Sequence, residues 1–155
     1  MNNDTIRRAI CDSQGLRIYT VTSTDAAREI TAIHETTPNA TVALGRTVTG
    51  TALLASTLKP GSTQSIAVRF SGNGPLREVY VQADANGGVR GYTSDPRVDE
   101  ETGLDSLNFS RAIGAGFLTV IRDLGMGEPY RTVTPLMYGD VAADLTYYLA
   151  SSEQI

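Results

Sequence analysis

The chain has 155 residues and a formal net charge of −4, from 13 Lys and Arg against 17 Asp and Glu. Hydrophobic residues make up 41% of the composition and charged residues 19%, which is typical of one globular domain rather than of a disordered chain. The acidic balance argues against a sequence-independent nucleic-acid partner. A single cysteine, Cys11, and a single histidine, His34, exclude an internal disulfide framework and a multi-thiolate metal site.

The first half of the chain predicts a β-hairpin followed by two helices. Strands at 9–11 and 16–22 flank the polar connection 12–15, which ends in a glycine. Thr24 is then suited to be the N-cap of a helix with apolar residues at helical spacing. A second helix, from Pro38 to Leu58, has proline in its first turn and apolar residues on more than one face, so it must be covered on more than one face.

The second half predicts a run of strands and a closing helix. Asn86 and Gly87 predict a type I′ hairpin turn, and the polar stretch 94–105 predicts a surface loop or a short irregular helix. Asp140 is suited to cap the last helix. Period-two alternation and β-rich composition predict strands at 65–71, 76–83, 89–93, 117–122 and 130–137.

This order of elements predicts an α+β fold, with a mixed, largely antiparallel sheet packed against the long central helix. No linker or repeat divides the chain, so we expect a single domain over residues 1–155. The strands around Phe70, Val79, Val81 and Phe117 are expected to need a cover on both sides of the sheet.

The chain predicts no membrane partner and a cytoplasmic location. The N-terminal residues contain no basic leader followed by a long apolar run, so we expect no secretory signal. Residues 38–58 approach the length of a bilayer span, but Arg46 at their centre favours a buried helix. The low cysteine content agrees with a reducing compartment.

Three glycine-containing segments superficially suggest phosphate binding, at 72–75, 114–116 and 125–127. Each is followed by a strand or by Glu-Pro, so none places a phosphate at a helix N-terminus. Residues 84–87 lack the ligand spacing of a calcium loop. Cys11 is expected to be a small core or edge residue. We therefore predict no catalytic, cofactor-binding or metal-binding residue in this chain.

Two alternatives to a pure binding domain stay open. One is a small hydrolase or lyase that uses His34, at the predicted end of the first helix, or a cluster of acids. The other is an oligomerisation scaffold without a client. The acidic cluster, which is most simply a solvated loop, contains Asp95, Asp99, Glu100, Glu101 and Asp105.

Several short segments, in this order, resemble the N-terminal core of the thirty-three-kilodalton heat-shock protein family. Each segment alone is unspecific, and the order and spacing along nearly the whole chain carry the resemblance. The matching pieces are Thr24-Asp25, His34-Glu-Thr-Thr-Pro38, Leu44-Gly-Arg46, Leu53-Leu-Ala55, Thr57-Leu-Lys59, Gly72-Asn-Gly-Pro75, Ala83-Asp-Ala85, Val89-Arg-Gly-Tyr92, Gly114-Ala-Gly116, Leu118-Thr-Val120, Asp123, Tyr130, Asp144-Leu145, Tyr148 and Ser152-Glu-Gln154.

The resemblance implies a redox-regulated, ATP-independent bacterial holdase that binds unfolded proteins under stress, acts in the cytoplasm, forms dimers and is not an enzyme. Family members are about twice this length and carry a C-terminal zinc module with four cysteines, which acts as the redox switch. Cys11 matches none of these cysteines, so the resemblance implies the first part of the core domain, without the zinc module and without a cofactor of its own. Truncation is expected to leave apolar surface or a sheet edge uncovered, and hence to favour self-association or client binding.

Overall fold

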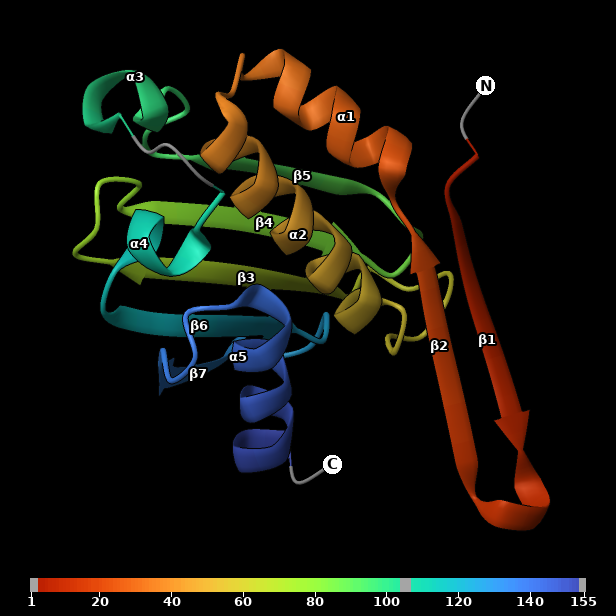
Figure 1. The fold of residues 1–155 in the computed structure, drawn as a ribbon. Helices are drawn as coiled ribbons and strands as arrows, with labels where there is room; N and C mark the ends of the chain where they lie inside the picture. The colour runs from red at the N-terminus through yellow and green to blue at the C-terminus, as the bar shows by residue number, and fades with distance from the viewer. Residues whose placement is uncertain (1–2, 104–106, 154–155) are drawn as a thin grey trace.

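The computed structural model describes residues 3–103 and 107–153 (Figure 1). Seven strands and five helices follow one another, with a short 3-10 turn at Asp12–Gln14 and a final π-helical turn at Leu149–Glu153. The elements are β1 (Thr5–Cys11), β2 (Leu16–Thr22), α1 (Thr24–Ile33), α2 (Pro38–Ala55), β3 (Ser65–Gly72), β4 (Glu78–Asp84), β5 (Val89–Thr93), α3 (Val98–Thr102), α4 (Phe109–Ile113), β6 (Gly116–Asp123), β7 (Tyr130–Pro135) and α5 (Val141–Tyr148).

The strands form two antiparallel sheets. Strands β5-β4-β3-β6-β7, in that order, make a five-stranded sheet, while β1 and β2 pair only with each other. In Figure 1 this two-stranded hairpin projects from the body beside the C-terminal end of α2. The α+β prediction is therefore confirmed, and every strand pair among the described residues is antiparallel.

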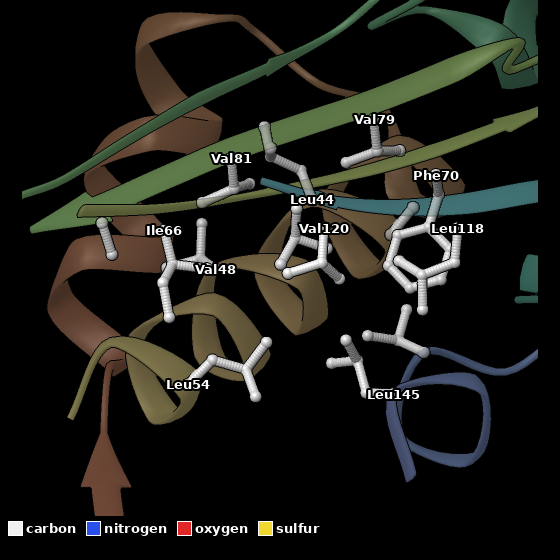
Figure 2. Close-up of a cluster of buried hydrophobic side chains, with 14 of the residues drawn as sticks. Leu44, Val48, Leu54, Ile66, Phe70, Val79, Val81, Leu118, Val120 and Leu145 are labelled. Carbon is white, nitrogen blue, oxygen red and sulfur yellow. The ribbon is translucent and has the colours of Figure 1, made fainter. Parts of the chain in front are cut away.

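Helix α2 lies across the five-stranded sheet and supplies the centre of the core (Figure 2). Leu44 and Val48 are fully buried on it, against Phe70 of β3 and Val81 of β4. Helix α1 and helix α5 contact other sides of α2, so the expectation of cover on several faces is confirmed. The core holds Ile30, Ala40, Ala43, Leu44, Val48, Leu54, Ala55, Leu58, Ile66, Val68, Phe70, Leu76, Val79, Val81, Ala83, Ala85, Val98, Phe109, Ala112, Ile113, Leu118, Val120, Val141, Leu145 and Tyr148.

The long helix ends at Ala55, three residues before the predicted Leu58. Serine and threonine side chains cause this early end, because they bond to carbonyls of the last turn. The Ser56 hydroxyl donates to the Leu53 carbonyl at 2.6 Å, and the Thr57 hydroxyl donates to the Leu54 carbonyl at 2.7 Å.

The predicted cap of the last helix is confirmed, whereas the predicted cap of the first helix is wrong. The Asp140 carboxylate accepts from the Ala143 N–H at 2.9 Å, as predicted. Thr24, however, is already inside α1, whose N-cap residue is Ser23. The exposed N–H groups of α1 are instead bound by the carboxylate of Asp4, which accepts from the Ala26 N–H at 2.7 Å. A cap supplied from outside the helix leaves no local sequence signal.

The turn between β4 and β5 is not the predicted type I′ turn. Such a turn needs a positive φ at both central residues, and here Gly87 has φ +92° whereas Asn86 does not adopt a positive φ. Asp84 organises the turn instead, because its carboxylate accepts from the backbone N–H groups of Asn86 at 2.8 Å and Gly88 at 3.0 Å.

The helices cover only one face of the five-stranded sheet. Phe70, Val79 and Val81 point into the helical layer and are fully buried, whereas Phe117 points to the opposite face and is 54% exposed. The strands were expected to need a cover on both sides of the sheet, and among the described residues only the inner side has one. We call the uncovered side the open face; it consists of Ser65, Ala67, Arg69, Ser71, Glu78, Tyr80, Gln82, Arg90, Tyr92, Phe117, Thr119, Ile121, Arg131, Val133 and Pro135.

Candidate functional site

His34 ends helix α1 and has a structural partner. Its Nε2 lies 2.9 Å from the carbonyl oxygen of Gly91 on β5. Within residues 3–103 and 107–153, no hydrogen bond joins His34 to a hydroxyl, thiol or carboxylate. A hydrolase or lyase mechanism through His34 would need such a partner to activate a nucleophile, and it stays a prediction without support here.

The acids of the loop after β5 serve to anchor helix α2. The Asp99 carboxylate accepts from the backbone N–H of Asn39 at 2.8 Å and from its side-chain amide at 2.7 Å. Burial raises the pKa of Asp99, but the hydrogen bonds from Asn39 and Thr37 outweigh it, so the pKa lies below its ordinary value. Glu100 pairs with Arg97 at 3.0 Å.

Asp99 and Glu100 lie in the short helix α3, which is one of the two structures that the sequence allowed for this stretch. Asp95 accepts from the backbone N–H of Arg97 at 3.1 Å. Asp105 and the side chain of Glu101 lie outside the described residues.

The family resemblance implies a zinc ion in a C-terminal module, and the described residues of this chain do not offer a site for it. Cys11 is free and exposed at the end of β1, where its Sγ lies 3.4 Å from the Ser13 hydroxyl. Among the described residues, no three side chains of the metal-binding types come together. A structural zinc site takes four such ligands, and the described residues bring no such set together.

The glycines at 72–75 serve packing. The Gly74 N–H donates to the Ile113 carbonyl at 2.8 Å, and a Cβ at Gly74 would overlap the Ala112 carbonyl oxygen. The β3–β4 connection therefore lies directly against the segment between α4 and β6. Strands β4 and β6 follow two of the three glycine segments, and the third, at 125–127, lies between β6 and β7, as the sequence indicated.

The half of the open face that lies on β6 and β7 is mostly apolar, and no element covers it among the described residues. We call it the apolar half; it consists of Phe117, Thr119, Ile121, Arg131, Val133 and Pro135. Phe117 of β6 is 54% exposed and Val133 of β7 is 51% exposed. The ladder pairs Phe117 with Pro135 and Thr119 with Val133, so these side chains lie side by side on one surface. Exposed apolar groups gathered on one face mark a binding surface more often than scattered ones do.

The other half of the open face is polar and aromatic. Tyr80 and Tyr92 stack with ring centroids 5.6 Å apart. The Arg69 guanidinium donates to the Glu78 carboxylate at 2.6 Å, and the Tyr92 hydroxyl donates to the same carboxylate at 2.9 Å. The hydrogen bond to Glu78 is the main reason that the pKa of Tyr92 is raised above its ordinary value.

Two further surfaces expose apolar side chains. The hairpin carries Ile10 on one face and Leu16 and Ile18 on the other, and all three are about half exposed or more. A groove of about 550 Å³ lies between α2 and α5, where Gly50 allows the Leu145 side chain to approach the helix backbone closely.

None of these surfaces was predicted as a site from the sequence. The period-two pattern of β6 could have indicated the open face, because Phe117 and Ile121 fall on the phase opposite to Leu118 and Val120, so both sides of this strand carry apolar residues. The pattern does not show which side of the sheet the described helices leave uncovered.

No helix in the described part of the chain is long and apolar enough to cross a membrane. The fold is an α+β domain that exposes apolar side chains on the open face, on the hairpin and in the groove between α2 and α5. The family model described as Hsp33 protein matches residues 4–155, and the chain belongs to this family.

Its relatives include the 33 kDa chaperonin of Geobacter sp. (strain M21), 46% identical over 98% of this chain and 51% of the relative, and that of Aquifex aeolicus (strain VF5), 41% identical over 94% of this chain and 46% of the relative. The crystal structure of the 33 kDa chaperonin from Thermotoga maritima matches with a TM-score of 0.88 and 33% identity, over 99% of this chain and 52% of that one. The chain spans about half the length of the curated relatives it matches.

Proposed function

We propose that this chain holds unfolded polypeptides without ATP, as the core of a cytoplasmic, stress-induced chaperone. The observation that carries the proposal is the open face, which presents Phe117 and Val133 to solvent beside an aromatic and charged half. Family membership supports it, because relatives at 41% and 46% identity are named 33 kDa chaperonin.

The open face suits a client without a fixed sequence. Burying exposed apolar area contributes roughly 25 cal/mol per Å², so a few hundred Å² yields several kcal/mol before ordering costs are subtracted. That amount supports weak, reversible binding, which is what holding a client requires. Arg69 pairs with Glu78, and Arg90 donates to the Gln82 amide oxygen at 2.9 Å, so the charged groups of the polar half already have hydrogen-bond partners within the chain.

An aggregation-suppression assay tests this proposal. A guanidinium-unfolded reporter enzyme is diluted into buffer with and without the chain, and light scattering is followed. The variant Phe117→Ser/Val133→Ser is expected to lose most of the suppression. The matched control Met126→Ser/Leu107→Ser removes comparably exposed residues outside the open face and is expected to keep it. Equal activity of the two variants would place client binding elsewhere.

We further propose that the chain forms homodimers through the hairpin. An isolated two-stranded hairpin is marginal in water, and Leu16 and Ile18, exposed on the same face of the hairpin, offer apolar surface that a second copy could cover. Sedimentation velocity on Leu16→Ser/Ile18→Ser should then show a shift to monomer. A dimer of unchanged affinity would refute this role of the hairpin, and a dimer without client binding would favour the scaffold alternative.

For redox control we propose that the switch of the family does not operate within this chain. One thiol cannot close an intramolecular disulfide, so zinc chelation should leave stability and client binding unchanged. Mild peroxide should act only by modifying Cys11 or by linking two chains through it. A strong oxidation-dependent gain of activity that Cys11→Ser abolishes would contradict this.

A further inference from the structure

A groove lies between helix α1 and strand β5. Its volume is about 370 Å³, and its helical side is formed by Ala26, Ile30 and Ile33. The strand side is formed by Val89 and Gly91. Ile33 is 68% exposed at the lip, so the groove is open to solvent and has an apolar wall.

Strand β5 is an edge of the five-stranded sheet, and its unpaired backbone groups face this groove. The Asp84 N–H donates to the Gly88 carbonyl at 2.9 Å, and the Ser94 N–H donates to the Glu78 carbonyl at 3.0 Å. Antiparallel pairs alternate, so the even-numbered residues of β5 bond to β4. Val89 and Gly91 therefore direct their N–H and C=O groups away from the sheet.

The contact of His34 agrees with this alternation. Its Nε2 lies 2.9 Å from the outward-pointing carbonyl of Gly91. The imidazole occupies that one acceptor and leaves the Gly91 N–H and both backbone groups of Val89 to face the groove. Helix α1 thus covers the edge only in part.

We propose that an extended, uncharged polypeptide segment adds to β5 as a further strand, within the groove between α1 and β5. This inference rests on the proposed function, because unfolded clients supply such segments. It adds a second mode of recognition to the open face, through the backbone rather than through side chains.

The chemistry of the groove selects this occupant. Donors and acceptors that recur at every second residue match only another backbone in the β conformation. Ile30 and Ile33 offer apolar contact to every second side chain of the added strand. The charged residues among those lining the groove, Glu29 and Arg90, have opposite signs, so their charges favour a neutral segment.

The opposite edge of the sheet is less suited to strand addition. The Leu136 N–H donates to the Gly116 carbonyl at 2.9 Å, so Arg131, Val133 and Pro135 face outward from β7. Proline lacks an N–H and an exposed charge discourages pairing, and both are devices that protect sheet edges. Strand β5 contains no proline, and its single charged residue, Arg90, donates to the Gln82 side chain of β4.

Fluorescence anisotropy with a labelled decapeptide of alternating Val and Thr tests the proposal. The variant Ile33→Lys is expected to weaken binding by at least about tenfold, because the apolar lip becomes charged. Met126→Lys, at a similarly exposed site far from the groove, is expected to bind as the original chain does. The same peptide N-methylated at every second residue keeps its side chains but loses one row of donors, and it is expected not to bind.

Amide hydrogen exchange locates the bound strand. Peptide binding is expected to slow exchange at Val89 and Gly91; slowing at Arg131 and Val133 instead, or wild-type affinity of Ile33→Lys, would overturn the inference. Suppressed aggregation without protection at Val89 and Gly91 would refute strand addition and leave the proposed function standing. Peptide binding with this protection in a chain that fails to suppress aggregation would do the reverse.

Discussion

The two faces of the five-stranded sheet are made by alternate residues of the same strands, yet they differ in every physical respect. On the inner face, Phe70 and Val81 are fully buried under α2. On the open face, Tyr92 and Phe117 contact solvent. Among the described residues, one helical layer therefore covers the sheet, and the second face is left in contact with solvent.

The open face itself has two halves that manage their exposure differently. Arg69, Glu78 and Tyr92 form hydrogen bonds with one another, so their polar groups are satisfied without a partner. The exposed side chains of Phe117 and Val133 are apolar, so water cannot satisfy them by hydrogen bonding and only burial would remove the cost of their exposure. The contrast indicates that the apolar half gains most from being covered, and it yields four predictions in order of size.

The largest effect is expected from comparing two phenylalanines on opposite faces. Phe70→Ala removes a fully buried ring that packs edge-on against Phe109, with centroids 5.4 Å apart, and should cost about 3–5 kcal/mol of unfolding free energy. Phe117→Ala should cost less than about 1 kcal/mol. Urea unfolding followed by circular dichroism measures both, and similar costs would show that the open face is covered in solution.

An intermediate effect is expected at the end of the sheet, where the β3–β4 connection is packed. Gly74→Ala places a methyl group against the Ala112 carbonyl and should destabilise the fold by about 1–3 kcal/mol. Gly45→Ala, in α2, meets only the Ala27 Cβ at 3.7 Å and should stabilise by up to about 1 kcal/mol.

Calorimetry on the same samples should detect no saturable ATP or NAD binding to the original chain.

A smaller, pH-dependent effect is expected where the helical layer is anchored. Asp99→Ala should cost about 1 kcal/mol at neutral pH, because α2 loses the carboxylate that binds its first turn. The pKa of Asp99 is lower in the folded chain, so its contribution is complete above about pH 4 and is lost as pH falls through the folded pKa. Unfolding curves across this range should converge for the two chains, and a constant difference down to acid pH would contradict the assignment.

The smallest effect is expected on the polar half of the open face. Glu78→Gln should change stability by less than about 1 kcal/mol, because the ion pair with Arg69 is partly exposed. It should also move the pKa of Tyr92 back toward its ordinary value, since the charge and hydrogen bond of Glu78 raise it. Ultraviolet titration of the tyrosines measures this shift, and an unchanged titration would exclude the contact.

Local pattern was sufficient for several elements but not for all of them. Strand β5 has the predicted bounds, and Asp140 caps α5 as expected. Helix α4 was missed because its five residues are too few to establish a period, although Asn108 caps it by accepting from the Arg111 N–H at 3.0 Å. Residues before Ala9 were missed because two arginines interrupt the pattern of β1, whose side chains are mostly exposed.

The candidate surfaces depended on information that no single segment holds. Alternation in β6 assigns Phe117 to one side of the sheet, but only the assembled fold shows that no helix reaches that side. The Asp4 carboxylate caps α1 across 22 residues of sequence. The Asp84 carboxylate binds backbone N–H groups within its own turn. Propensity scales describe neither.

The bond between Asn39 and Asp99 has a consequence for the order of events on the ribosome. Its partners are 60 residues apart in the chain, so the start of the longest helix emerges well before the carboxylate that binds it. At about 5–20 residues per second, translation needs roughly 3–12 s to supply that residue. During most of this interval the apolar faces of α2 have neither their anchor nor most of their sheet, so they stay exposed until the later strands are made.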